Sequence, residues 1–566
     1  MKVALVVQRY GAEINGGAEL HARYVAEHLA RHVQVEVLTT CARDYITWAN
    51  DYPAGETEVG GIRVRRFPVT RARDPKTFGD WSERVFGSRH SLNDELAWLD
   101  AEGPTSPALV RYVADRQTDY DFVLFFSFRY YHSYHGARAV PGKAVLVPTA
   151  ERDEALGLGI FPPVLRSVRA FMYNSPEERA LLQAAAGTDE VPGVVVGVGS
   201  EVPRAARPER FRQKTGIHER TAIYIGRIDE NKGCVELFDF WKRYAEITPG
   251  GLTLVLIGNP VLPIPQHPRI RHLGFVSDDD KYDALAAAEF LIMPSYFESL
   301  SMVALEAWAL GKPVLANGKC DVLRGQAIRS NAGLYYESFP EFVEAVRVLE
   351  GAPGVAGALG RNGSAFFRTH YSWPVIERKY LEMFERLREE DRAAVARRPL
   401  APMPGWWARR QRSLPPAREV LAGLPAGPVT GRAATRAERP QAPRRDRPGR
   451  DGGESVGRRP EREGRRDARE ARPAGSTAPA GTGDGPSGGR REQRPNHRDR
   501  DRRNRSRDGR PPASQPPAST DSAPRAPKAA PEGGTGVPRG DQRPRGQRGG
   551  RRRGRRPGPR PGKDQA

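Results

Sequence analysis

The sequence predicts an α/β chain made of two successive halves, each an open parallel sheet with helices on both faces. Short apolar runs of strand length alternate with longer segments of helical periodicity, and this pattern restarts near residue 221. Strands that alternate with helices are typical of parallel, doubly wound sheets. We therefore expect one half over 1–198 and a second over 199–372, joined through 194–203.

The N-terminal half begins with a strand and a helix. The run VALVV at 3–7 is bounded by turn-prone residues, which indicates a buried parallel strand. A glycine-containing loop and an amphipathic helix over about 18–31 follow. The later strand-like runs of this half are 35–39, 122–126, 144–148 and 170–174.

The C-terminal half repeats this organisation and ends in a long helix. Its strand-like runs are 221–226, 253–258, 290–295, 312–317 and 333–336. A final helix is predicted at about 374–394, because five apolar residues share one helical face. These residues are Ile376, Tyr380, Met383, Phe384 and Leu387.

The last third of the chain has a different composition. Residues 401–566 hold 41 Lys and Arg against 18 Asp and Glu, a net charge of +23. The whole chain has a net charge of +21, so residues 1–400 carry a net charge of −2. After Trp407 the chain contains no Phe, Tyr, Trp or Ile. Such a segment buries too little apolar surface to fold, so we expect a disordered tail over 399–566 and a complete catalytic unit within 1–400.

The arginine-rich tail has two interpretations of equal weight. Disordered segments rich in Arg and Gly bind polyanions such as RNA or an anionic membrane surface. The alternative is a solvated linker without a partner.

Cysteine content and hydropathy indicate the compartment. Cys41, Cys234 and Cys320 lie far apart, so the sequence predicts neither a disulfide framework nor a zinc ribbon. No signal peptide is evident, and no apolar run reaches the ~18 residues of a spanning helix. We expect a cytoplasmic protein without a transmembrane segment, and the sequence leaves peripheral attachment to the inner face of the membrane open as an alternative.

The strongest chemical motif lies at 290–317, where Glu298 and Glu306 form an E-x7-E pair. Glu298 follows a strand at its carboxyl end, which is where open α/β sheets bind ligands. The helix that begins after Ser299, Leu300 and Ser301 leaves free amides that suit a phosphate. The alternative is a helix with a solvated acidic face.

Two further motifs suit a bound phosphate. Arg227 and Lys232 flank a glycine-bounded loop directly after the strand at 221–226, and two fixed cations suit a departing pyrophosphate. Gly16 and Gly17 precede the first helix, where backbone can approach a phosphate. A surface turn with ordinary salt bridges and a plain tight turn are the respective alternatives.

Together these motifs resemble the family-four retaining glycosyltransferases over about residues 1–392. The resemblance implies a GT-B fold, in which two Rossmann-like domains face a cleft and a C-terminal helix, here 373–398, crosses back to the N-terminal domain. It implies that Glu298 lies by the donor sugar, Glu306 binds the ribose and Arg227 and Lys232 hold the diphosphate. Gly16 and Gly17 match the loop near the donor phosphates.

One loop departs from the family pattern. Relatives often carry a histidine that faces the sugar, whereas PTAERDE at 148–154 has none and offers Glu151, Arg152, Asp153 and Glu154. We take Arg152, Asp153, Glu154 and His135 as acceptor-side candidates. His132 and His135 form an H-x-x-H pair for which a structural role is favoured, and no metal ligand set is evident.

The resemblance implies transfer of a sugar from a nucleotide-diphosphate donor, without a metal or other cofactor. The acceptor would be a glycan, a lipid-linked intermediate or a small molecule, as in cell-envelope polysaccharide synthesis. The alternatives are another GT-B activity, such as an epimerase or a phosphorylase, and a polyanion-binding protein that acts through its tail.

Overall fold

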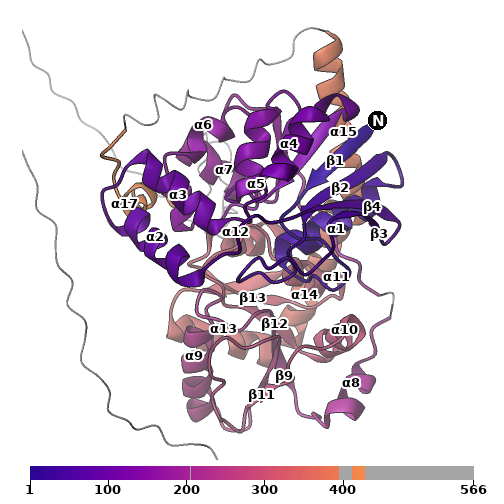
Figure 1. Ribbon diagram of the computed structural model, residues 1–566. Coiled ribbons are helices and arrows are strands. Elements are labelled where there is room, and N and C mark those ends of the chain that lie inside the picture. Colours follow the sequence, from indigo (N-terminus) through magenta and orange to yellow (C-terminus); the bar gives the residue numbers. More distant parts are fainter. Residues whose placement is uncertain (204, 394–410, 428–566) are drawn as a thin grey trace, which may run out of the picture. The chain divides into compact units, whose positions relative to one another are not determined.

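The computed structural model describes residues 1–203, 205–393 and 411–427, and their strands form two sheets (Figure 1). The strands of the first sheet are β1 (Lys2–Val6), β2 (Gln34–Thr40), β3 (Gly55–Val59), β4 (Ile62–Phe67), β5 (Phe122–Phe126), β6 (Ala144–Val147), β7 (Ala170–Tyr173) and β8 (Gly193–Val195). The strands of the second sheet are β9 (Thr221–Ile225), β10 (Thr253–Ile257), β11 (Ile270–His272), β12 (Phe290–Met293), β13 (Val314–Asn317) and β14 (Gly333–Tyr336).

Helices alternate with these strands along most of the chain. Those of the first half are α1 (Gly17–Leu29), α2 (Pro75–Gly87), α3 (Leu92–Glu102), α4 (Pro107–Asp115), the 3-10 turn η1 (Gln117–Asp119), α5 (Tyr131–Ala139), the 3-10 turn η2 (Glu154–Gly157), α6 (Phe161–Leu165) and α7 (Pro176–Ala186). Those that follow are α8 (Pro208–Thr215), α9 (Cys234–Ile247), α10 (Asp278–Ala287), α11 (Met302–Ala309), α12 (Asp321–Ser330), α13 (Phe339–Gly351), α14 (Pro353–His370), α15 (Trp373–Arg392) and α17 (Ala417–Ala422).

The first sheet has the order β3-β4-β2-β1-β5-β6-β7-β8. All its neighbouring strands run parallel except β3, which pairs antiparallel with β4. The predicted strands are present, but the β3–β4 hairpin and β8 were not predicted. The sequence of β3, GETEV, is polar and mostly exposed, so it carries no apolar run that would mark a strand.

The second sheet has the order β11-β10-β9-β12-β13-β14, with parallel neighbours throughout. Strands β9 and β12 lie side by side although about 65 residues separate them, and Ile223 pairs with Leu291. The strand order reverses at this pair, and such a reversal is where open α/β sheets bind ligands. The predicted α/β class with parallel sheets is confirmed.

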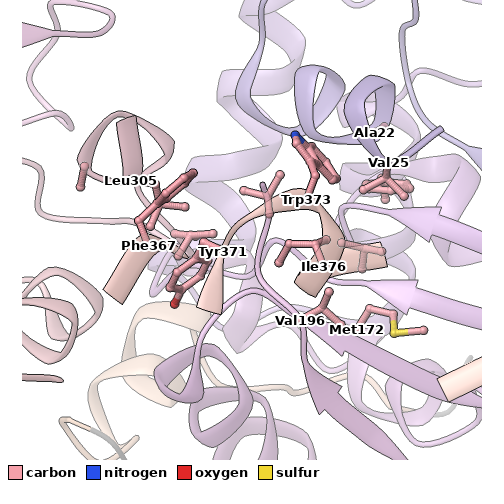
Figure 2. Packing of buried hydrophobic residues seen from close by; sticks show 14 of the residues in the cluster. Ala22, Val25, Met172, Val196, Leu305, Phe367, Tyr371, Trp373 and Ile376 are labelled. Atoms are coloured by element: carbon pink, nitrogen blue, oxygen red, sulfur yellow. The ribbon is translucent and has the colours of Figure 1, made fainter. Parts of the chain in front are cut away.

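One hydrophobic core contains residues of both sheets and joins the two halves. Figure 2 shows Val25 of α1 and Met172 of β7 close to Ile376 of α15, with Phe367 of α14 and Leu305 of α11 nearby. All five side chains are buried. Because these residues come from both halves, the two halves are held together by a common hydrophobic core as well as by polar contacts.

Helix α15 packs against elements of the first sheet. The five residues of its predicted apolar face are all buried. Phe384 stacks on Phe122 of β5 with ring centroids 5.3 Å apart, and buried Arg169 donates to Glu390 at 2.8 Å. The helix that follows the second sheet therefore returns to the first.

Part of the expected tail is folded, so the prediction that structure ends at residue 398 was wrong. Residues 411–427 include α17, which lies beside α2 and η2 (Figure 1). Ala417 is fully buried, and Leu414, Leu421 and Leu424 pack against the first half. The prediction rested on the average composition of the arginine-rich segment, and these few apolar residues do not alter that average. The other residues of the predicted tail lie outside the described part.

Among the helices described, none combines the length and apolar character needed to cross a lipid bilayer.

Candidate active site

A partly buried ion pair lies at the point where the second sheet reverses its strand order. Lys232 follows β9 and Glu298 follows β12, and Lys232 Nζ lies 2.7 Å from Glu298 Oε1. Burial lowers the pKa of Lys232, but the Glu298 and Glu151 carboxylates outweigh it and leave that pKa raised. Lys232 therefore stays positively charged at neutral pH.

A glycine allows the loop of Lys232 to approach the end of β12. Gly233 has a φ of +69°, and a Cβ at this position would lie 2.0 Å from the Pro294 carbonyl oxygen. A residue with a side chain would push the two loops apart. The close contact of the loops is what lets Lys232 reach Glu298.

Arg227 is held by its own loop. Its Nε donates to the Asp229 carboxylate, which also accepts from the Lys232 amide at 2.8 Å. The Arg227 side chain is 53% exposed, and its positive charge contributes to lowering the pKa of Lys232. Asp229 thus holds the Arg227 guanidinium and the backbone of Lys232 in one loop, with Arg227 turned partly to solvent.

Glu306 is a buried carboxylate with one unused oxygen. Its Oε1 accepts from Lys281 Nζ at 3.0 Å and from the Tyr282 hydroxyl at 3.2 Å. Its Oε2 has no hydrogen-bond partner within the described part of the chain. Burial raises the pKa of Glu306, and Lys281 opposes this effect. The unused oxygen can accept a hydrogen bond from a ligand hydroxyl.

Residues 299–301 lead into α11 as predicted. The Ser301 hydroxyl caps the helix by accepting from the Ala304 amide at 3.2 Å, and Leu300 is buried. The Ser299 hydroxyl accepts from Asn174 Nδ2 of the first half at 3.3 Å. The start of α11 is therefore tied to the loop that follows β7.

The two glycines before α1 have a packing explanation. A Cβ on Gly16 would lie 2.2 Å from Glu19 Oε2, and Glu19 is buried in an ion pair with Arg9 at 2.6 Å. Gly17 has open space at its Cβ position. The structure thus requires glycine at 16 for internal packing and leaves room beside Gly17.

Glu151 approaches the ion pair from the first half. It follows β6, and burial raises its pKa to about 7, with Lys232 lowering it and Glu298 raising it. The sequence interpretation quoted Glu151 but did not include it among the acceptor-side candidates. Its position beyond the carboxyl end of a central strand was the signal that could have selected it.

A second buried carboxyl holds the loop of Glu151. Glu178 accepts from the Ala150 amide at 2.6 Å and from the Asn174 amide at 2.5 Å. Burial raises its pKa to about 8. Glu178 therefore joins the loops that follow β6 and β7, the two loops of the first half that reach toward Glu298 and Ser299.

The other three residues predicted in this loop have partners elsewhere. Asp153 bonds Arg129 Nη1 at 2.5 Å. Glu154 pairs with Arg418 at 3.3 Å, and Arg152 Nη1 donates to the Leu424 carbonyl at 3.2 Å. Two of the three are thus engaged by the segment 411–427.

The histidines sit in structural positions. His135 packs between Tyr131 and Tyr134, at centroid distances of 4.3 and 4.9 Å, and burial lowers its pKa to about 4. His132 hydrogen-bonds the Phe126 carbonyl oxygen. None of the contacts described for His135 reaches Lys232, Glu298 or Glu151, so the structure does not bring this candidate into the cluster.

A cavity of about 80 Å³ lies beside Glu298. Both halves and the segment 411–427 line it, through Ala150, Arg152, Glu177, Glu178, Leu181, Tyr296, Phe297, Glu298, Lys319, Cys320, Asp321, Val322 and Gly427. Its walls carry both signs of charge and two aromatic rings. This mixture suits a small polar group such as a sugar ring better than an apolar ligand.

Comparison with known proteins identifies the domain that carries the ion pair. Residues 219–349 match the family model described as glycosyl transferases group 1. The chain is 24% identical over 446 residues to a glycogen synthase of Mycobacterium tuberculosis, covering 71% of this chain and 98% of the relative. It is 23% identical over 198 residues to a mannosylfructose-phosphate synthase of Agrobacterium fabrum, covering 32% of this chain and 43% of the relative.

Solved structures show the same fold. A sucrose-phosphate synthase from Thermosynechococcus elongatus superimposes with a TM-score of 0.52 at 17% identity, covering 68% of this chain and 98% of that structure. Anabaena HepE in complex with UDP-glucose superimposes with a TM-score of 0.51 at 18% identity, covering 68% and 100%. The chain therefore has a GT-B-like α/β fold. Its second half contains a group 1 glycosyltransferase domain.

Proposed function

We propose that this protein is a retaining glycosyltransferase that moves a sugar from a nucleotide-diphosphate donor to a hydroxyl of an acceptor. One observation carries the proposal. Lys232 and Glu298 form an ion pair where the second sheet reverses its strand order, and Glu151 approaches this pair from the first half. The arrangement supplies a fixed cation for a leaving group between carboxyl groups that can hold sugar hydroxyls.

The leaving diphosphate is stabilised by Lys232, by Arg227 and by the amides at the start of α11. Negative charge grows on the diphosphate as the glycosidic bond breaks, so fixed cations lower the barrier to transfer. Asp229 holds the Arg227 guanidinium and Glu298 holds the Lys232 ammonium in place before the donor binds. In this proposal the cations do the work that a divalent metal does in other transferases.

Glu306 binds the donor ribose and Glu298 orients the donor sugar. The free Oε2 of Glu306 is buried, and a ribose hydroxyl would give it the partner that it lacks. Glu298 lines the cavity, where its carboxylate can accept from sugar hydroxyls. The complex of HepE with UDP-glucose, a protein of the same fold, supports a nucleotide-sugar donor.

The acceptor lies on the side of the first half. Glu151 takes the place of the histidine of the family pattern, as a carboxyl group of the first half that interacts electrostatically with Lys232 and Glu298. The names of the relatives range from glycogen synthase to mannosylfructose-phosphate synthase, so we propose the acceptor only as a hydroxyl-bearing glycan, lipid-linked intermediate or small molecule. A cytoplasmic location fits such an enzyme.

The arginine-rich segment beyond residue 427 favours a second, separate role in polyanion binding. Its composition is the observation in favour, since 428–566 holds 37 Lys and Arg against 17 Asp and Glu, a net charge of +20. Such binding should weaken steeply with salt, because it depends on the release of counterions. Salt titration of the full chain with RNA and with anionic vesicles tests this role.

The enzymatic proposal is tested by a panel of nucleotide sugars. We expect one of them to raise the unfolding temperature of the full chain and to release its nucleoside diphosphate when an acceptor is added. Release that needs no acceptor but yields an isomerised sugar would indicate an epimerase instead. If every nucleotide sugar leaves the unfolding temperature unchanged, the proposal is wrong.

A further inference from the structure

Residues 411–427, here called the strap, run along the first half close to the candidate site. The strap begins with an antiparallel bridge, in which Leu414 donates to the His90 carbonyl at 2.8 Å and His90 donates back at 3.2 Å. It continues through α17, where Ala417 is fully buried. A Cβ on Gly157 would lie 2.2 Å from the Ala417 carbonyl oxygen, so the backbones are in close contact.

The strap then takes up polar groups of the candidate site. Arg418 pairs with Glu154 at 3.3 Å, and Arg152 donates to the carbonyl oxygens of Leu424 and Pro425. Both partners belong to the loop 148–154, where a polar acceptor would find its hydrogen-bonding groups. The strap satisfies Arg152 with its backbone and Glu154 with the Arg418 side chain, and thereby occupies both groups.

The end of the strap contacts the second half. The Gly427 amide donates to Asp321 Oδ2 at 2.8 Å, at the first residue of α12. Arg152, Asp321 and Gly427 all line the cavity beside Glu298. The strap therefore extends from the first half to the second along the wall of this cavity.

The strap is held by few buried side chains. Pro416 and Ala417 are its buried residues, whereas Leu414, Leu421 and Leu424 are only partly buried. Ordering seventeen residues costs backbone entropy. The small apolar area that the strap buries offsets this cost only by a narrow margin. A segment bound in this way can be released without unfolding the sheets.

We propose that the strap is a releasable cover that competes with the acceptor for Arg152 and for the cavity beside Glu298. When bound, it occupies Arg152 and Asp321 and restricts entry to the acceptor side. When released, it frees both residues and opens the cavity. The competition with an acceptor rests on the proposed function, whereas the covering itself does not.

The test compares the full chain with Ala417→Asp, which places a charge in the buried contact with Gly157. Glu419→Ala is the matched control, since Glu419 is exposed on the same helix. Cleavage by trypsin after Arg418 reports release of the strap, and hydrogen exchange followed by mass spectrometry reports cover over 150–154 and 319–323. We expect Ala417→Asp to be cut sooner and to exchange at least about fivefold faster in both segments, with the control unchanged.

Gly427→Pro provides a second variant that leaves the apolar contacts intact. It removes the amide that donates to Asp321 and, because Gly427 has a φ of +77° that proline cannot adopt, displaces the end of the strap, so exchange should rise at 319–323 and stay unchanged at 150–154. Equal cleavage after Arg418 in the parent chain and in Ala417→Asp would overturn the proposal. So would unchanged exchange in both segments once the strap is cut.

The turnover rate of the nucleotide sugar identified by the panel shows whether the strap blocks the site or helps to form it. We expect Ala417→Asp to release nucleoside diphosphate at least about threefold faster than the parent chain. A slower rate would show that the strap helps to build the site and would overturn the competition. If no nucleotide sugar binds either protein, the proposed function fails and the exchange measurement still decides whether the strap is a cover.

Discussion

At the scale of single residues, four ionisable side chains determine what the site can do. Lys232 keeps its charge because Glu298 lies 2.7 Å away and Glu151 is nearby. Glu151 has its pKa raised to about 7, so its ionisation falls in the neutral range. Glu306 keeps one buried oxygen free for a ligand. A diphosphate bound by the cations would meet carboxyl groups positioned for the sugars on either side of it.

Removing the Lys232 cation should abolish most of the activity. We expect Lys232→Ala to lower kcat for diphosphate release by about 10²–10³-fold, because the cation stabilises charge that develops in the transition state. Lys242→Ala is the matched control, since Lys242 is exposed on α9. If the substitution raises only the donor KM and leaves kcat unchanged, Lys232 binds the donor equally well in the ground state and in the transition state.

The raised pKa of Glu151 predicts a pH-dependent stability. A carboxyl whose pKa is higher in the folded state stabilises the fold below its ordinary pKa of about 4.5, and this stabilisation is lost as pH rises toward 7. Between pH 5 and 8 we expect the parent chain to lose on the order of 2 kcal/mol more unfolding free energy than Glu151→Gln. Urea unfolding at both pH values measures this difference.

The same titration with Glu190→Gln, at an exposed carboxyl, should follow the parent chain. Identical pH dependence of the parent chain and Glu151→Gln would show that Glu151 is solvated rather than buried against Lys232 and Glu298.

At the scale of elements, the loops after β9 and β12 build the ion pair because their strands are neighbours. Gly233 allows these loops to touch, since its Cβ position is filled by the Pro294 carbonyl oxygen and its φ is +69°. Helix α11 then begins at Met302, shortly after Glu298, and carries Glu306 among its buried residues. Strand pairing and one glycine thus place residues that are 66 positions apart in contact.

A matched pair of glycine substitutions tests this account. Gly250 has a φ of +75° with open space at its Cβ position, so Gly250→Ala should lose about 1–2 kcal/mol through backbone strain alone. Gly233→Ala adds a clash with the Pro294 carbonyl and should lose about 1–3 kcal/mol more. Urea unfolding compares the two, and equal losses would contradict the close contact of the loops.

The buried strands of both sheets were predictable because each is a continuous apolar run, whereas the short strands β8 and β11, which are not fully buried, were not predicted. Runs such as 122–126 and 221–225 are buried at every position, and this burial is what their sequences indicate. The hairpin β3–β4 was missed because β3 is charged and exposed. The strap was missed because a few apolar residues lie within a long arginine-rich segment.

At the scale of the whole described chain, contacts between the halves complete the site. Glu177 forms an ion pair with Arg329 across the halves, and Asn174 bonds Ser299 nearby. Sequence patterns identified Arg227 and Lys232 in a single loop, because local spacing is visible in a sequence. They did not select Glu151, because its partners Lys232 and Glu298 lie in the other half of the chain.

The central claim is that the second half binds a nucleoside diphosphate through Lys232 and Glu306 without a metal. Calorimetric titration of the full chain with UDP, GDP and ADP in the presence of EDTA tests it most directly, with Glu306→Ala compared against exposed Glu246→Ala. We predict that one nucleotide binds the parent chain and Glu246→Ala equally and binds Glu306→Ala at least about tenfold more weakly. Binding that requires added Mg²⁺ or Mn²⁺, or that is the same in Glu306→Ala, would contradict the claim.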